Sequence, residues 1–155
     1  MKFSQPQLDP VIKQLIGDLI CVRFFFLNLK SLLNSQQTQN YAKIIYSLIR
    51  KLSNRPDVII TDGKNPVLWY INGLQGITET PNSQKIVDTT GAGDAFLAGL
   101  ISKLISSGYP SNELEIEDCI RFAGVCGLLT CLGEGAIEQQ PYYEKVNKFL
   151  GSLIS

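Results

Sequence analysis

The sequence predicts an α/β protein in which helices pack on a β-sheet. Short apolar runs of strand-like composition alternate along the chain with longer stretches whose apolar residues recur at helical spacing. The chain has 155 residues, of which 45% are apolar, so it is long enough for one buried core and too short for two. We therefore expect residues 1–155 to form a single domain.

The first half of the chain contains one amphipathic helix and two strands. Residues 41–54 carry apolar side chains in an i, i+3, i+4 pattern, which predicts a helix. Residues 57–61 are expected to form a short buried strand, residues 62–66 a turn, and residues 67–71 a second strand. Asn72-Gly73 then favours a hairpin.

The second half of the chain alternates in the same way. Residues 85–87 predict a strand that leads into a glycine-containing turn at 88–94, and residues 95–105 predict a helix. A further helix is expected from about 115 to 132, where acidic residues suit its first turn. Pro141 opens a last amphipathic helix.

Composition excludes several functional classes. The chain has no histidine, which rules out Ser-His-Asp triads, Cys-His dyads and histidine-ligated metal sites. Four cysteines without a Cys-x-x-Cys pair favour buried thiols in a reducing cytosol over disulfides. No run is long and apolar enough to predict a membrane span or a signal peptide, so we expect a cytoplasmic protein that does not enter a membrane.

Charge is unevenly distributed along the chain. Residues 1–56 hold eight basic and two acidic side chains. A nucleic-acid surface is one interpretation of this asymmetry. The basic residues are dispersed among apolar ones, however, so solvated helix surface is the better interpretation and no nucleic-acid partner is expected.

The segment from Asp88 to Asp94 is the strongest chemical signal in the sequence. Its glycines, Gly91 and Gly93, allow backbone N–H groups to approach a ligand closely, and a helix begins immediately after them. The N-terminus of a helix attracts anions, phosphate above all. A carboxylate at this position, Asp94, suits a general base that takes the proton of an attacking hydroxyl. The alternatives are an ordinary strand-to-helix turn and a helix-capping aspartate.

Residues 88–96, Asp-Thr-Thr-Gly-Ala-Gly-Asp-Ala-Phe, match at every position the second signature of the PfkB, or ribokinase-like, carbohydrate kinases. Residues 58–63 resemble the family's nucleotide-binding strand and Thr-x-Gly turn, and residues 121–137 resemble its late helix and Gly-Ala-Ile loop. These flanks are most similar to the fructokinase-like branch. The resemblance covers residues 55–150, the nucleotide-binding and catalytic C-terminal half, and leaves residues 1–54 as a poorly matched helical segment. It implies part of a ribokinase-like three-layer sandwich.

The resemblance also implies a role for each matched residue. Asp94 would be the catalytic base that accepts the proton of the sugar's primary alcohol. The other roles are an anion hole at Gly91, Ala92 and Gly93, nucleotide contacts at Thr61, Gly63 and Gly124, and a monovalent-cation site at Asp88, Thr90, Thr130, Gly133 and Gly135. The reaction would convert ATP and a fructose-like sugar to ADP and a sugar phosphate. Mg²⁺ would assist the reaction, through ligands that the sequence does not identify. K⁺ is the candidate monovalent cation. A homodimer is left open.

Three departures from the family pattern leave two alternative functions open. Pro66 stands where the family has the second glycine of its nucleotide turn, and Gly124 stands where relatives commonly have asparagine. An acidic Asn-x-x-Glu-like element is missing, because no glutamate precedes Glu79. The sugar-binding half and its β-sheet lid also lack a counterpart. The chain is therefore expected to be a truncated sugar kinase or, alternatively, a non-catalytic nucleotide- or partner-binding remnant.

Two aromatic features and a possible dinucleotide-binding fold also need an interpretation. Residues 24–26, three phenylalanines, are interpreted as a strand or core segment rather than a sugar- or partner-binding patch. Trp69 is interpreted as core packing rather than sugar stacking. A dinucleotide-binding fold is disfavoured, because Phe96 stands where the third glycine of that fingerprint belongs.

Overall fold

The computed structural model describes residues 24–28, 47, 56–83, 85–135 and 137–153. The predicted helix at 41–54 lies outside these residues except for Ser47, as does most of the segment 1–54. The described elements are one sheet and three helices. They are β1 (Phe24–Asn28), β2 (Asp57–Asp62), β3 (Asn65–Ile71), β4 (Leu74–Thr78), α3 (Ala92–Ser107), α4 (Glu113–Thr130) and α5 (Tyr143–Ser152).

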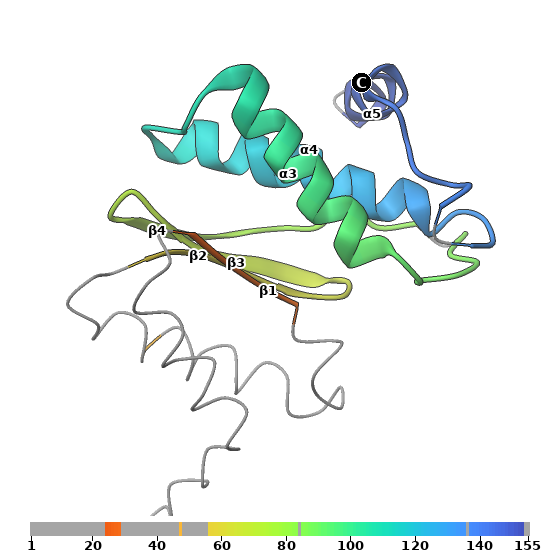
Figure 1. The fold of residues 1–155 in the computed structure, drawn as a ribbon, viewed down its shortest axis with the longest axis horizontal. Helices are drawn as coiled ribbons and strands as arrows, with labels where there is room; N and C mark the ends of the chain where they lie inside the picture. The colour runs from red at the N-terminus through yellow and green to blue at the C-terminus, as the bar shows by residue number, and fades with distance from the viewer. Residues whose placement is uncertain (1–23, 29–46, 48–55, 84, 136, 154–155) are drawn as a thin grey trace, which may run out of the picture.

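The four strands form one sheet in the order β1-β2-β3-β4 (Figure 1). β1 pairs with β2 in parallel, and the other neighbours are antiparallel. The strands predicted at 57–61 and 67–71 are confirmed as β2 and β3, and the strand interpretation of residues 24–26 is confirmed as β1. The sheet is therefore mixed, with its single described parallel pair at β1 and β2.

The hairpin predicted at Asn72-Gly73 joins β3 to β4. Asn72 has φ 51° and Gly73 has φ 80°, so both residues adopt the positive φ that a tight two-residue hairpin turn needs. Ile71 and Leu74 pair directly on either side of the turn. Asparagine and glycine are the residues that tolerate this backbone conformation best, which explains why the local sequence sufficed to predict the turn.

The three predicted helices are present, with shifted starts. α3 begins at Ala92 rather than Ala95, because Gly91 takes the left-handed conformation and serves as its N-cap. α4 begins at Glu113, since the side chain of Asn112 accepts a hydrogen bond from the Glu115 N–H and caps the helix. α5 begins two residues after Pro141. Of the three helices, α4 alone has a side-chain cap hydrogen bond among the described residues.

The strand predicted at residues 85–87 is wrong. These residues form an irregular connection that pairs with no described strand. The Val87 N–H instead donates to the carbonyl oxygen of Cys131, at the end of α4, over 2.8 Å. The β-branched composition favours a strand, but the hydrogen-bond partner of this segment is the end of α4 rather than a neighbouring strand.

Helices α3 and α4 lie side by side over one face of the sheet, and α5 packs on α4 away from the sheet (Figure 1). The main core lies between the sheet and the two helices, with residues from β2, β3, α3 and α4: Ile59, Val67, Trp69, Ile71, Phe96, Leu100, Ile116, Cys119, Ile120 and Ala123. Trp69 is a core residue, as predicted, and donates a hydrogen bond to Thr78. Cys119, Cys126 and Cys131 are all buried free thiols, also as predicted.

The indole of Trp69 packs directly on Gly76 in the neighbouring strand. A Cβ at Gly76 would lie 2.2 Å from the Trp69 ring. We expect Gly76→Ala to lower the free energy of unfolding by about 1–3 kcal/mol, because the ring must leave a filled core. Gly151→Ala is the control, since a Cβ there meets nothing within 4 Å and alanine favours the helix. Chemical denaturation measures both, and equal stability of the two variants would refute this packing.

Candidate active site

The N-terminus of α3 presents backbone N–H groups without internal partners. Its N-cap Gly91 has φ 78°, and no side chain caps the helix. The Ala95 N–H donates to the Gly91 carbonyl, and the Ala92 N–H donates to the Thr89 carbonyl over 3.3 Å. Among the described residues, no acceptor bonds the N–H groups of Gly91, Gly93 or Asp94. These donors converge at the positive end of the helix, the arrangement that binds phosphate.

Asp94 is the third residue of α3, and its side chain is exposed. Its carboxylate forms no hydrogen bond or ion pair with any described residue. The capping role is not supported, because Gly91 occupies the N-cap position and no side-chain cap bond is present. An unbonded carboxylate beside free N–H donors has the geometry of a base next to an anion site.

Close packing of α4 holds the first turn of α3 in place. A Cβ at Gly127, in α4, would lie 3.0 Å from the carbonyl oxygen of Ala92. Glycine at this position therefore lets the two helix backbones approach closely. The N–H donors of α3 are fixed on a rigid support rather than on a free loop.

Asp88 joins the turn before α3 to the loop after α4. Its Oδ1 accepts hydrogen bonds from the Thr90 N–H over 2.9 Å and from the Thr90 hydroxyl over 2.8 Å. Its Oδ2 accepts a longer bond, 3.4 Å, from the Gly135 N–H. The bonds from Thr90 are the largest cause of a lowered pKa at Asp88, so the carboxylate stays charged at neutral pH. Three of the five residues predicted for the monovalent cation thus lie together.

The other two predicted cation residues are placed differently. Thr130 is fully buried, and its hydroxyl donates to the Cys126 carbonyl within α4, so only its backbone remains for a ligand. Gly133 lies against the side chain of Gln139, whose amide atoms would be 2.4–2.7 Å from a Cβ at Gly133. No local sequence pattern indicates that Gln139 lies at this loop.

Thr61 lies near the carboxyl end of β2, at an irregularity in its pairing with β3. The side chain is 8% exposed, and its hydroxyl oxygen is buried and has no hydrogen-bond partner among the described residues. A buried hydroxyl is costly unless a partner satisfies it. Gly63 follows in the exposed turn with φ 56°. Both residues therefore fit the edge of a ligand site.

Pro66 does not disrupt the turn between β2 and β3. It lies inside β3, and Asp62 pairs with Asn65 across the turn. The Asn65 side-chain amide also donates to the Asp62 carboxylate over 2.7 Å. Gly124, the third predicted nucleotide residue, lies in α4 against Pro81, whose Cδ would be 2.9 Å from a Cβ at Gly124. Pro81 is a second residue that the sequence did not indicate.

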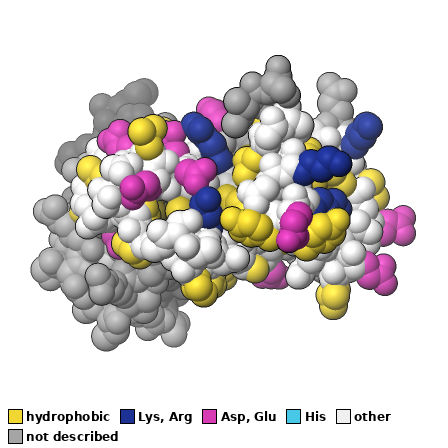
Figure 2. Space-filling model, turned by 90° about the horizontal axis from the view of Figure 1, so that it is seen from above, with side chains coloured by type: hydrophobic (Ala, Val, Ile, Leu, Met, Phe, Trp, Pro, Cys, Tyr) yellow, Lys and Arg dark blue, Asp and Glu magenta, His cyan; other side chains and the backbone are white. Residues whose placement is uncertain are grey.

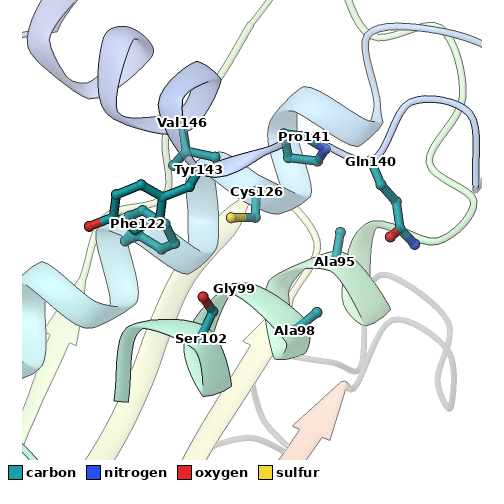
Figure 3. A pocket seen from close by; sticks show the side chains of 10 residues that line it. All are labelled: Ala95, Ala98, Gly99, Ser102, Phe122, Cys126, Gln140, Pro141, Tyr143 and Val146. Carbon is teal, nitrogen blue, oxygen red and sulfur yellow. The ribbon is translucent and has the colours of Figure 1, made fainter. Parts of the chain in front are cut away.

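A separate pocket of about 200 Å³ lies between α3, α4 and the start of α5 (Figure 3). Its lining includes Phe122, Cys126 and Tyr143, and none of the residues predicted for the active site. Within the described ranges, no three acidic or cysteine side chains gather into a metal site. No helix of the described part is long and apolar enough to cross a membrane.

A family model for the pfkB family carbohydrate kinases matches residues 2–142. The chain belongs to this family. The match begins at residue 2 and so includes residues outside the 55–150 range of the motif resemblance. The predicted family is confirmed, and the Asp88–Asp94 turn lies within the matched range.

Curated relatives include fructokinases. The chain is 42% identical over 62 residues to a fructokinase of Salmonella thompson, and 33% identical over 99 residues to a probable fructokinase-7 of Arabidopsis thaliana. These alignments cover 40% and 63% of this chain, but only 28% and 29% of the relatives. The resemblance to the fructokinase-like branch is confirmed, and the chain matches less than a third of each of these relatives.

Solved structures show the same fold. The chain superimposes on a fructokinase of Xylella fastidiosa with bound ATP. The TM-score is 0.72 at 21% identity, and the match covers 97% of this chain and 49% of that chain. A fructokinase of Vibrio cholerae O395, in a form with bound fructose, ADP and calcium ion, gives a TM-score of 0.67 at 23% identity. This match covers 90% of this chain and 44% of that chain. The fold is thus ribokinase-like in part, as predicted, and the chain spans about half of these kinases.

Proposed function

We propose that this chain forms the nucleotide-binding and catalytic part of an ATP-dependent carbohydrate kinase that phosphorylates a primary alcohol of a fructose-like sugar. The observation that carries this proposal is the unbonded Asp94 carboxylate beside the free N–H groups of Gly91 and Gly93 on α3. The fructokinase relatives and the fructokinase fold support it.

Phosphoryl transfer needs charge stabilisation and a proton acceptor, and α3 offers both. The N–H groups of Gly91 and Gly93 would donate to the transferred phosphoryl group as negative charge grows on it, and so would lower the barrier electrostatically. Asp94 accepts the proton of the attacking hydroxyl, which makes the oxygen a stronger nucleophile. The Ala92 N–H already donates to Thr89, so we give it a smaller part in this anion hole.

The remaining predicted residues suit the nucleotide and its cations. The unpartnered hydroxyl of Thr61 and the exposed backbone at Gly63 would contact the nucleoside portion of ATP. Mg²⁺, when bound with ATP, supplies neutralisation of phosphate charge. The charged carboxylate of Asp88, together with Thr90 and the loop at Gly133 and Gly135, would hold K⁺. The buried free thiols of Cys119, Cys126 and Cys131 favour a cytoplasmic location.

A second candidate function is a non-catalytic nucleotide-binding protein. The observation that favours it is coverage, because the chain spans only 49% of the Xylella fructokinase chain. Figure 2 shows basic and acidic side chains interspersed over the face viewed from above, without an extended patch of one sign on that face. The two candidates differ in turnover and agree on nucleotide binding.

Titration calorimetry with ATP and Mg²⁺ tests the shared part of both candidates. We expect weak but saturable binding, somewhat tighter in K⁺ than in tetramethylammonium, because the larger ion cannot enter the Asp88 loop. The lack of any heat of binding at millimolar ATP would contradict a nucleotide site. Equal affinity in the two salts would contradict only the K⁺ site.

A further inference from the structure

Thr80 and Pro81 connect two separate segments that carry predicted nucleotide-binding residues, namely the turn after β2, which holds Gly63, and α4, which holds Gly124. The Thr80 hydroxyl donates to the Lys64 carbonyl over 2.8 Å and lies 3.5 Å from the Asn65 carbonyl, both in or beside the turn between β2 and β3. Pro81, the next residue, packs on Gly124 in α4. Two consecutive residues thus link the end of the strand that carries Thr61 to the helix that carries Gly124.

We propose that Thr80 and Pro81 form a bridge that positions the nucleoside-binding side of the site, and that Thr80 is a positioning residue for ATP. This inference rests on the proposed function. The bridge holds the turn after β2 through one hydroxyl, and it holds α4 through a contact that leaves no room for a side chain at position 124.

The phosphate-binding side of the site does not depend on this bridge. The first turn of α3 is held by the bonds of Ala92 and Ala95 to Thr89 and Gly91, and by the close approach of Gly127. Neither Thr80 nor Pro81 contributes to those contacts. Loss of the Thr80 hydroxyl should therefore weaken contacts to the nucleoside and leave contacts to the phosphates unchanged.

The test compares two ligands on matched variants of the full chain. Thr80→Val keeps the shape of the side chain and removes the donor, while Thr80→Ser retains the hydroxyl. Tyr109→Phe is the control, because the Tyr109 hydroxyl also joins distant segments, donating to Asp57 at the start of β2. Binding of ATP with Mg²⁺ and of inorganic tripolyphosphate with Mg²⁺ is measured for each protein.

We expect Thr80→Val to bind ATP about 2–10-fold more weakly, the usual effect of one hydrogen bond. Tripolyphosphate affinity should be unchanged, Thr80→Ser should restore ATP binding, and Tyr109→Phe should match the unmodified chain.

Equal losses for ATP and tripolyphosphate would show a merely structural role and overturn the proposal, as would unchanged ATP affinity in Thr80→Val. If the unmodified chain binds tripolyphosphate but not ATP, the bridge is wrong and the site on α3 stands. If it binds neither ligand, the proposed function fails as well.

Discussion

Asp94→Asn is expected to reduce sugar phosphorylation by about 10²–10⁴-fold, the usual contribution of a positioned general base. The assay uses a chimera that joins this chain to the part of a fructokinase that it does not cover. Asparagine has nearly the same shape but cannot accept the proton of the sugar hydroxyl. ATP affinity should hold or rise slightly, because a carboxylate facing the γ-phosphate is repulsive before the reaction begins.

Glu113→Gln is the matched control for this prediction. Glu113 also places a carboxylate in the first turn of a helix, but in α4 and outside the predicted site. Turnover of this variant should equal that of the unmodified chimera, and melting curves should show both variants folded. Near-normal turnover by Asp94→Asn would contradict the catalytic role.

The 155-residue chain alone is expected to show negligible sugar phosphorylation. It spans about half of the fructokinase structures it resembles, and phosphoryl transfer requires the sugar hydroxyl to be held in line with the γ-phosphate. Without the remaining half, water also has access to the site, which weakens the electrostatic contribution of the α3 donors.

Coupled ADP-release assays with fructose, ribose and glucose measure this second prediction. The chimera should turn over at an ordinary kinase rate of about 1–100 s⁻¹, while the chain alone stays at background. Sugar-dependent turnover by the chain alone at such rates would show that its own residues complete the sugar site. Inactivity of both proteins would instead favour the non-catalytic candidate.

Local signals predicted most of the fold correctly. The Asn72-Gly73 hairpin follows from two residues that tolerate positive φ, and α4 was predicted from acidic residues that suit a first helical turn. The strand expected at 85–87 was wrong, because the Val87 N–H bonds to Cys131 rather than to a neighbouring strand. That partner lies in another part of the chain, where no local pattern indicates it.

For the candidate site, too, local sequence indicated the contiguous residues and missed those brought together from distant segments. The N–H groups of Gly91 and Gly93, the exposed Asp94 carboxylate and the Asp88 turn lie in one region because these residues are contiguous, and their roles stay predictions. Thr80, Pro81 and Gln139 were missed. Their contacts join segments that only the folded chain brings together, such as the Thr80 hydroxyl with Lys64, sixteen residues away.

The most direct test of a phosphate site on α3 is the perturbation of backbone amide NMR shifts by ATP with Mg²⁺. We expect the largest changes at the N–H groups of Gly91, Gly93 and Asp94, with a second set at Thr61 and Gly63. Inorganic tripolyphosphate should reproduce the first set only. Changes confined to the pocket between α3, α4 and α5, with the α3 N-terminus unaffected, would contradict the proposed site.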